Sequence, residues 1–255
     1  MLEAVLNVFQ FELRRSLTRQ RIVLWVLLAV FPSLLLSLML FDESAGLSDE
    51  LIIGVLYVLV PQLTCMLSLL LWMTPAIQSE LETSAWPYLA VRPRGRRAVV
   101  IGKYFNAVLW TIITMGVSLS LAIMVAQPLH LTKTFAVLFA IGTLSAFGYG
   151  TLYALIAVII PQRAMIMSLA YTLVIEYVIG FVPAIINHVT FSFRLRVLFI
   201  DWMGWSNMPQ GASAIMSSDQ HAIVHLFMML VLMAIFTAST MYILNRREFV
   251  ASDDG

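Results

Sequence analysis

The chain has 255 residues, of which 61% are apolar and 11% are charged, and its formal net charge is +1. A soluble domain carries roughly 25% charged residues, so this composition excludes an ordinary soluble protein and indicates a chain built for lipid. Its balanced charge gives no basic surplus for nucleic acid, which is not among the expected partners.

Residues 1–20 come first and do not form a span. Their apolar side chains recur at steps of three and four residues, which predicts an amphipathic helix. Because arginines accompany it, we expect this helix to lie in the headgroup plane of the membrane; a frayed basic tail is the alternative. The apolar positions are Leu2, Val5, Leu6, Phe9, Leu13 and Leu17.

Six apolar segments then follow, each as long as the roughly 20 residues that a helix needs to cross the hydrocarbon core. Their continuous apolar character predicts helices, because barrel strands would alternate. We therefore expect an all-α, polytopic membrane protein with a single transmembrane domain over residues 1–255. The six expected spans are 22–41, 51–74, 104–127, 134–160, 164–187 and 222–244. The first is too long for the apolar region of a cleavable signal peptide and is expected to stay as an anchor.

The basic residues divide unequally between the two sides of these spans. Twelve of the fifteen Lys and Arg fall on one side, and only Lys133, Arg194 and Arg196 fall on the other. Basic loops stay in the cytoplasm, so both termini are expected there, in a multi-pass protein of the plasma (bacterial inner) membrane.

Two spans carry features that affect helix packing. Pro61 lies in the middle of the second span and should kink it, because it removes a backbone hydrogen bond. The fourth span has small residues at strict four-residue spacing, which would let another helix approach closely. That helix could belong to this chain or to a second copy. The stripe consists of Gly142, Ala146, Gly150 and Ala154.

Glu176 is an acidic residue near the middle of the fifth span. A carboxylate at such depth costs about 2.5–3.5 kcal/mol on insertion scales and suggests a functional site. In a structural role it would be protonated or hydrogen-bonded and would hold two helices together, using Tyr171, Thr172 or a residue of another span. In a functional role its charge would take part in substrate coupling or in conformational coupling. A proton relay would lack a second acid within the spans.

The residues after the fifth span, 188–221, mix aromatic with basic side chains, as is typical of the membrane interface. We expect one or two short helices on, or dipping into, the outer leaflet. His221 and His225 are four residues apart near Asp219, with His188 at the other end of this loop. Two histidines are too few for a structural zinc site, so no metal site is predicted.

The chain contains no H-E-x-x-H, G-x-S-x-G or phosphate-loop motif. We therefore expect no enzyme activity and no catalytic residues in this chain. We also expect no cofactor on it.

The loop expected at 75–103 is the most charged part of the chain. It begins with Glu80 and Glu82 and closes with basic residues, and apolar side chains lie between them. A charged, amphipathic segment at the cytoplasmic surface is a docking surface for lipid headgroups or for a protein. A lipid-binding patch explains the arginines, but anionic headgroups would repel the paired acids. The basic residues are Arg92, Arg94, Arg96, Arg97 and Lys103.

This loop resembles the first cytoplasmic loop of type-2 ABC exporter permeases, the membrane subunits of one branch of the ATP-binding-cassette transporters. The family pattern is E-x-E-x-G-T, an apolar stretch, P-x-x-R and then G-K. Glu80 and Glu82 match the paired acids, Pro93 and Arg96 match P-x-x-R, and Gly102–Lys103 match the closing pair. The sequence departs from the pattern at Gly-Thr, where it has Ser-Ala. As a layout, the resemblance extends over the whole chain.

The resemblance implies that the loop is a coupling helix seated in a cleft of a separate ATPase subunit, which would hold the ATP and Mg. Two ATPase copies and a second permease copy, identical or closely related, would complete the transporter within membrane lipid. Apolar knobs would then fill the cleft and charges would set the register at its rim. The alternative is a non-transporting membrane scaffold or sensor that recruits a cytosolic partner through the same loop. The residues expected to couple are Glu80, Leu81, Glu82, Trp86, Leu89, Pro93, Arg96 and Lys103.

Overall fold

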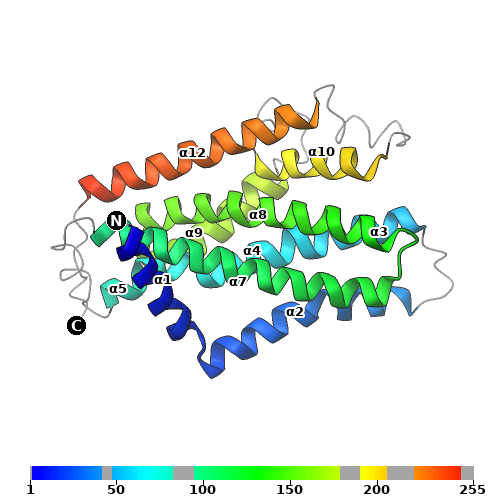
Figure 1. The fold of residues 1–255 in the computed structure, drawn as a ribbon, viewed down its shortest axis with the longest axis horizontal. Helices are drawn as coiled ribbons and strands as arrows, with labels where there is room; N and C mark the ends of the chain where they lie inside the picture. Colours follow the sequence, from blue (N-terminus) through cyan, green and yellow to red (C-terminus); the bar gives the residue numbers. More distant parts are fainter. Residues whose placement is uncertain (1, 42–47, 83–94, 179–189, 206–220, 248–255) are drawn as a thin grey trace.

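The computed structural model describes residues 2–41, 48–82, 95–178, 190–205 and 221–247. All secondary structure in this part of the chain is helical, and the helices form one elongated bundle (Figure 1). The expectation of an all-α chain is confirmed.

Five helices of the described residues are long and apolar enough to cross a membrane, which fits a multi-pass membrane protein. They correspond to the expected spans one, two, three, four and six. The fifth expected span begins as α9 (Ala164–Tyr171) and continues as the π-helical η5 (Thr172–Val178), and its remainder lies outside the described residues. A sixth span therefore stays a prediction. The five helices are α2 (Arg19–Leu40), the run Asp49–Glu82, α7 (Gly95–Ala126), α8 (Leu131–Ile159) and α12 (Ala222–Arg246).

The second span is not uniform. It runs through α3 (Asp49–Tyr57), the π-helical η2 (Val58–Thr64) and α4 (Cys65–Trp72). Pro61 lies inside η2, where the wider π-helical turn accommodates a residue that has no N–H to donate. In the same turn, the Thr64 hydroxyl donates to the carbonyl of Leu59 at 2.8 Å.

The expected loop 75–103 is partly helical. It begins with η3 (Thr74–Ala76) and α5 (Gln78–Glu82), and α7 already starts at Gly95 rather than at residue 104. The helix that carries the third expected span therefore begins nine residues before that span does, and the start of the span itself stays a prediction. The 32 residues of α7 extend for about 48 Å, which exceeds the roughly 30 Å of hydrocarbon, so its first turns can carry charges.

The bundle packs around α7 and α8, which contact each other along their length. The small-residue stripe of α8 faces α7: a Cβ atom on Gly142 would lie 1.8 Å from the Met115 sulfur, and one on Gly150 would lie 2.9 Å from the Tyr104 ring. For these two glycines, the helix that approaches closely belongs to the same chain.

The outer helices present apolar side chains to the surroundings. On α12, Ile223, Phe227, Leu230 and Ile235 are each more than half exposed. A soluble protein rarely leaves so large an apolar face uncovered, whereas lipid tails would cover it favourably.

The N-terminal helix α1 (Leu2–Ser16) packs against α7. It turns Glu12 and Ser16 inward, and Trp110 of α7 donates its indole N–H to the Ser16 hydroxyl at 2.8 Å. Phe11, in contrast, is exposed. An amphipathic helix is thus present, and its placement in the headgroup plane stays a prediction.

Replacing Gly150 by Leu should destabilise the bundle, because the new side chain overlaps the Tyr104 ring on α7. Overpacking of this kind costs about 1–3 kcal/mol. The loss of stability is measured as a lower melting temperature in detergent, which is read from the loss of the monodisperse gel-filtration peak on heating. Gly54→Leu is the matched control, since no atom lies within 4 Å of its Cβ position. Equal melting temperatures for the two variants would contradict the close α7–α8 contact.

Candidate functional site

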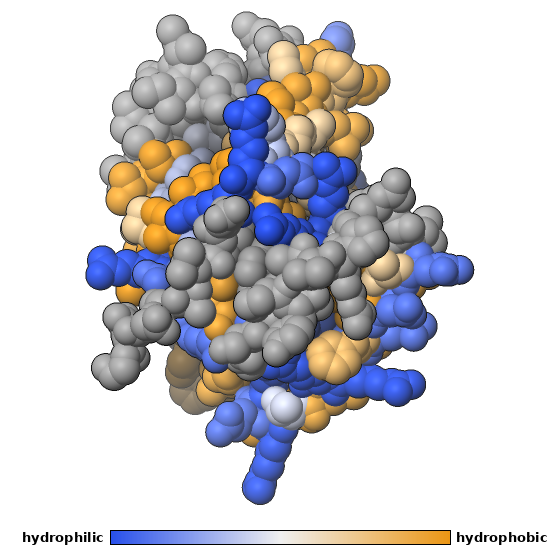
Figure 2. Space-filling model, turned by 90° about the vertical axis from the view of Figure 1, so that its left-hand side faces the viewer, coloured by the Kyte–Doolittle hydropathy of each residue, from blue (hydrophilic) through white to orange (hydrophobic). Residues whose placement is uncertain are grey.

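At one end of the bundle α1 begins, α5 and the start of α7 lie, and α12 ends (Figure 1). Figure 2 looks onto this end and shows hydrophilic side chains around it. We call it the basic end. Its described basic residues include Arg96, Arg97, Arg246 and Arg247.

A buried lysine organises the basic end. The Lys103 ammonium donates to Glu80 Oε1 at 2.5 Å, to the Ala76 carbonyl at 2.8 Å and to the Ser79 hydroxyl at 3.0 Å, and it lies 3.5 Å from Glu12 Oε1. Lys103, Glu80 and Glu12 are each less than a tenth exposed. A lysine that is buried in this way needs such partners, because an unpaired charge in an apolar environment is very costly.

Arg15 completes this arrangement from the solvent side. Its guanidinium lies 3.6 Å from Glu80 Oε1 and 4.0 Å from Glu12 Oε1. Two cations and two carboxylates thus balance, and they join α1, α5 and α7. We call Glu12, Arg15, Glu80 and Lys103 the Lys103 node.

Gly102 brings α1 close enough to reach this node. A Cβ atom there would lie 2.7 Å from Val8 Cγ1 and 3.3 Å from the backbone nitrogen of Phe9, so only glycine permits the contact without a shift of α1. The two residues of the G-K pair therefore have distinct structural roles. Gly102 admits α1, and Lys103 binds it through Glu12.

The other expected coupling residues have different surroundings. Glu82 is exposed and accepts a hydrogen bond from Gln78 Nε2 at 2.8 Å, whereas Leu81 is partly buried against a small apolar cluster that includes Ile77 and Val100. Arg96 donates to the Arg247 carbonyl at 3.4 Å. Trp86, Leu89 and Pro93 lie outside the described residues.

The end of α12 is tied to the same region. Arg97 Nε donates to Asn245 Oδ1 at 3.0 Å, and Arg247 donates to the Val158 carbonyl at 3.1 Å and to the Ile159 carbonyl. The last carbonyls of α8 thus find donors from α12, so α7, α8 and α12 are joined at the basic end.

Glu176 occupies a second, separate site deep in the bundle. Its carboxylate accepts the Tyr149 hydroxyl at 2.9 Å, the Ser192 backbone N–H at 2.8 Å and the Phe191 backbone N–H at 3.4 Å. Phe191 and Ser192 begin α10 (Phe191–Met203), whose N-cap Thr190 accepts from the Phe193 N–H. Glu176 therefore satisfies the unpaired donors at a helix start, where the helix dipole also favours a negative charge.

A lysine serves the other end of α10. Lys133 Nζ donates to the Met203 carbonyl at 2.8 Å, and Gly204 ends the helix in the left-handed conformation with φ of 75°. The Glu176 carboxyl group thus lies at the end of α10 where the helix dipole favours negative charge, and the Lys133 ammonium lies at the end where it favours positive charge. The short helix expected within residues 188–221 is present as α10, and ten of its thirteen residues are buried.

The expected partners of Glu176 were Tyr171, Thr172 or a residue of another span, and the structure has a residue of the fourth span. The expected neighbour Thr172 contacts Tyr153 at 2.7 Å rather than Glu176, and it is Tyr149, one turn before Tyr153 on α8, that reaches the carboxylate. The pair of tyrosines four residues apart in an apolar span was the available signal. Glu12 was not among the expected site residues, and the packing of α1 against α7 brings it to Lys103.

The histidines form no metal site in the described part of the chain, where no group of three or more potential ligands occurs. His225 is buried, with its ring 6.0 Å from that of Phe193. His188 and Asp219 fall outside the described residues.

No family model matches this sequence, and no curated protein matches it either. The resemblance to the exporter permeases therefore depends on the loop pattern and on the layout of helices.

Replacing Lys103 by Met should destabilise the protein by up to about 3–5 kcal/mol, because Glu80 and Glu12 would stay buried with only Arg15, on the solvent side, to balance them. The melting temperature in detergent measures this. Adding Glu80→Gln to the same variant should restore part of the loss, because one buried carboxylate, Glu12, then remains for the one cation, Arg15. Arg163→Met, at an exposed position, is the control. A double variant as unstable as Lys103→Met alone would contradict the direct pairing.

Glu176→Gln should fold and assemble normally, because the amide can still accept from α10 and bond to Tyr149. Glu176→Leu leaves three donors unsatisfied, at about 1–3 kcal/mol each, and should lose stability. Expression level and melting temperature distinguish the two. A functional charge would instead appear as lost transport in Glu176→Gln at normal stability. If Leu performs as well as Glu in every assay, neither role is correct.

Proposed function

We propose that the chain is the permease subunit of an ABC exporter, which works as a pair of permeases with two separate ATPase chains. In this proposal the protein spans the plasma membrane with its basic end in the cytoplasm. The observation that carries the proposal is the pattern from Glu80 to Lys103, set in a chain with five helices long enough to span.

The Lys103 node supports this proposal because it joins the two sides of the expected coupling segment, Glu80 before it and Lys103 after it. Residues 83–94 follow Glu80 and precede Lys103 in the chain, and these two side chains are in contact at 2.5 Å. A force applied to residues 83–94 would thus act on the Lys103 node, which joins α7 to α5 and α1.

The node also suggests how motion would spread. Closure of the ATPase dimer would shift the segment, and the ion pairs would carry the shift to α1 through Glu12 and to the long helix α7 through Lys103. Buried ion pairs suit this task, because separating them is costly and so they move as a unit.

The direct test is to express the chain with the ATPase encoded by a neighbouring reading frame. The two proteins should co-purify, and the permease should change the rate of ATP hydrolysis. Recruitment of a cytosolic partner without ATPase activity or transport would instead favour the scaffold or sensor. A neighbouring gene without a phosphate-loop ATPase would weigh against the exporter.

The expected rim charges need separate tests, since Glu80 is buried in the node and its loss would also destabilise the fold. Glu82 is exposed, so Glu82→Ala should leave the melting temperature unchanged while weakening ATPase association. Pull-down affinity and stimulated ATPase rate are the measurements. Glu50→Ala, an exposed acid at the opposite end of the bundle, is the matched control. If both variants bind the ATPase as the wild type does, Glu82 is not a contact.

A further inference from the structure

We propose that the outer face of α7 binds one anionic phospholipid, with an acyl chain on each side of Phe105 and the phosphate at Arg97. This requires only that the chain spans a membrane, and it does not depend on the proposed transport.

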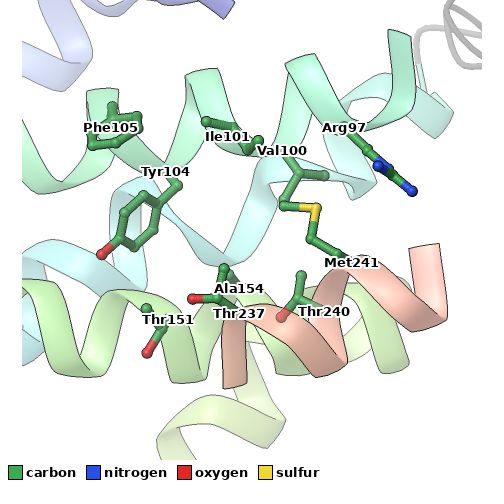
Figure 3. Close-up of a pocket in the computed structure, with 10 residues that line it drawn as sticks. All are labelled: Arg97, Val100, Ile101, Tyr104, Phe105, Thr151, Ala154, Thr237, Thr240 and Met241. Atoms are coloured by element: carbon green, nitrogen blue, oxygen red, sulfur yellow. The ribbon is translucent and has the colours of Figure 1, made fainter. Parts of the chain in front are cut away.

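The first groove lies between α7, α8 and α12 and has a volume of about 310 Å³. Figure 3 shows its lining, with Arg97 at one end of the row of α7 side chains and Tyr104 and Phe105 at the other. Arg97, Ile101 and Phe105 are spaced by four residues and so form one stripe along α7. At 1.5 Å per residue, the stripe from Arg97 to Phe105 is about 12 Å long.

This groove offers an occupant almost no hydrogen bonds away from Arg97. Its other polar side chains are Tyr104 and three threonines. Two of the threonines already donate to their own helix, Thr151 to the Gly148 carbonyl and Thr240 to the Phe236 carbonyl, both at 2.7 Å. The Tyr104 hydroxyl likewise donates to the Phe147 carbonyl. Such walls suit a hydrocarbon chain better than a polar solute.

A second groove adjoins the first one on the other side of Phe105. It has a volume of about 410 Å³ and an entirely apolar lining, including Val5 and Phe9 of α1 and Val108 of α7. Phe105 lines both grooves, and its side chain is 47% exposed. Two apolar grooves that share one exposed ridge match the two tails of a diacyl lipid.

Charge decides which lipid fits best. No carboxylate lines either groove among the described residues, while Arg97 is exposed at the basic end of the first. Its hydrogen bond to Asn245 uses Nε, which leaves the two terminal nitrogens of the guanidinium for a phosphate. Arg96 and Arg246 lie at the same end and favour a headgroup with net negative charge.

The test is native mass spectrometry of the detergent-purified full chain, titrated with phosphatidylglycerol or with phosphatidylcholine of the same acyl chains. We expect the wild type to bind the first molecule of phosphatidylglycerol roughly fivefold more tightly than the first molecule of phosphatidylcholine. One arginine at the membrane surface would provide a preference of this size. Arg97→Gln should remove most of that preference, because Arg96 and Arg246 do not line the groove. The matched control is Arg163→Gln, which removes an exposed arginine that lines neither groove.

A second variant tests the groove itself. Thr237 lines it from α12 and is exposed, so Thr237→Phe should fill the groove without disturbing the core. It should weaken binding of both lipids at least as much as Arg97→Gln weakens phosphatidylglycerol. The control is Ala238→Phe, at the neighbouring exposed position outside the groove. This variant should bind both lipids as the wild type does.

Three results would overturn the proposal. The wild type could bind both lipids equally, or Arg97→Gln could keep the preference. Alternatively, Thr237→Phe could leave lipid binding intact and alter the oligomeric state instead, which would make the groove a contact between copies of the chain. A melting temperature for each variant ensures that binding is compared among folded proteins.

Discussion

The structure depends on one constraint: a charge placed among apolar helices must find its partner inside the protein, because lipid supplies none. Lys103 finds Glu80 and Glu12, and Glu176 finds the start of α10. Each pairing fixes an element that hydrophobic burial alone would leave free to slide, since lipid tails are as apolar as the helices. The charged side chains therefore determine where α1, α5 and α10 lie.

The Lys103 node and Glu176 lie in different parts of the bundle. At the basic end the Lys103 node joins an N-terminal helix to the segment that we propose meets an ATPase. In the interior, Glu176 and Lys133 hold α10 at its two ends, so this buried helix is positioned by electrostatics as well as by packing. Between them, α7 and α8 pack closely through Gly142 and Gly150 and form the common frame.

The candidate site could be predicted from the sequence only in part. The paired acids and the closing Gly-Lys were visible as a pattern, and their assignment to a partner surface followed from the resemblance. The structure gives Glu80, Gly102 and Lys103 an additional role within the chain, since they contact or admit α1. Spacing along a chain does not reveal such a contact, because Lys103 and Glu12 are distant in sequence and meet only when α1 folds back onto α7.

The sequence by itself determined the helical class, the existence of the long apolar helices and the burial of Glu176, because continuous apolar runs and a lone carboxylate have few physical solutions in lipid. Only the tertiary structure decided the π-helical turn at Pro61, the early start of α7 and the partners of the buried charges. These three features depend on which helices pack against each other. A side chain such as Tyr149 becomes a partner of Glu176 only through the packing of α8 against η5 and α10.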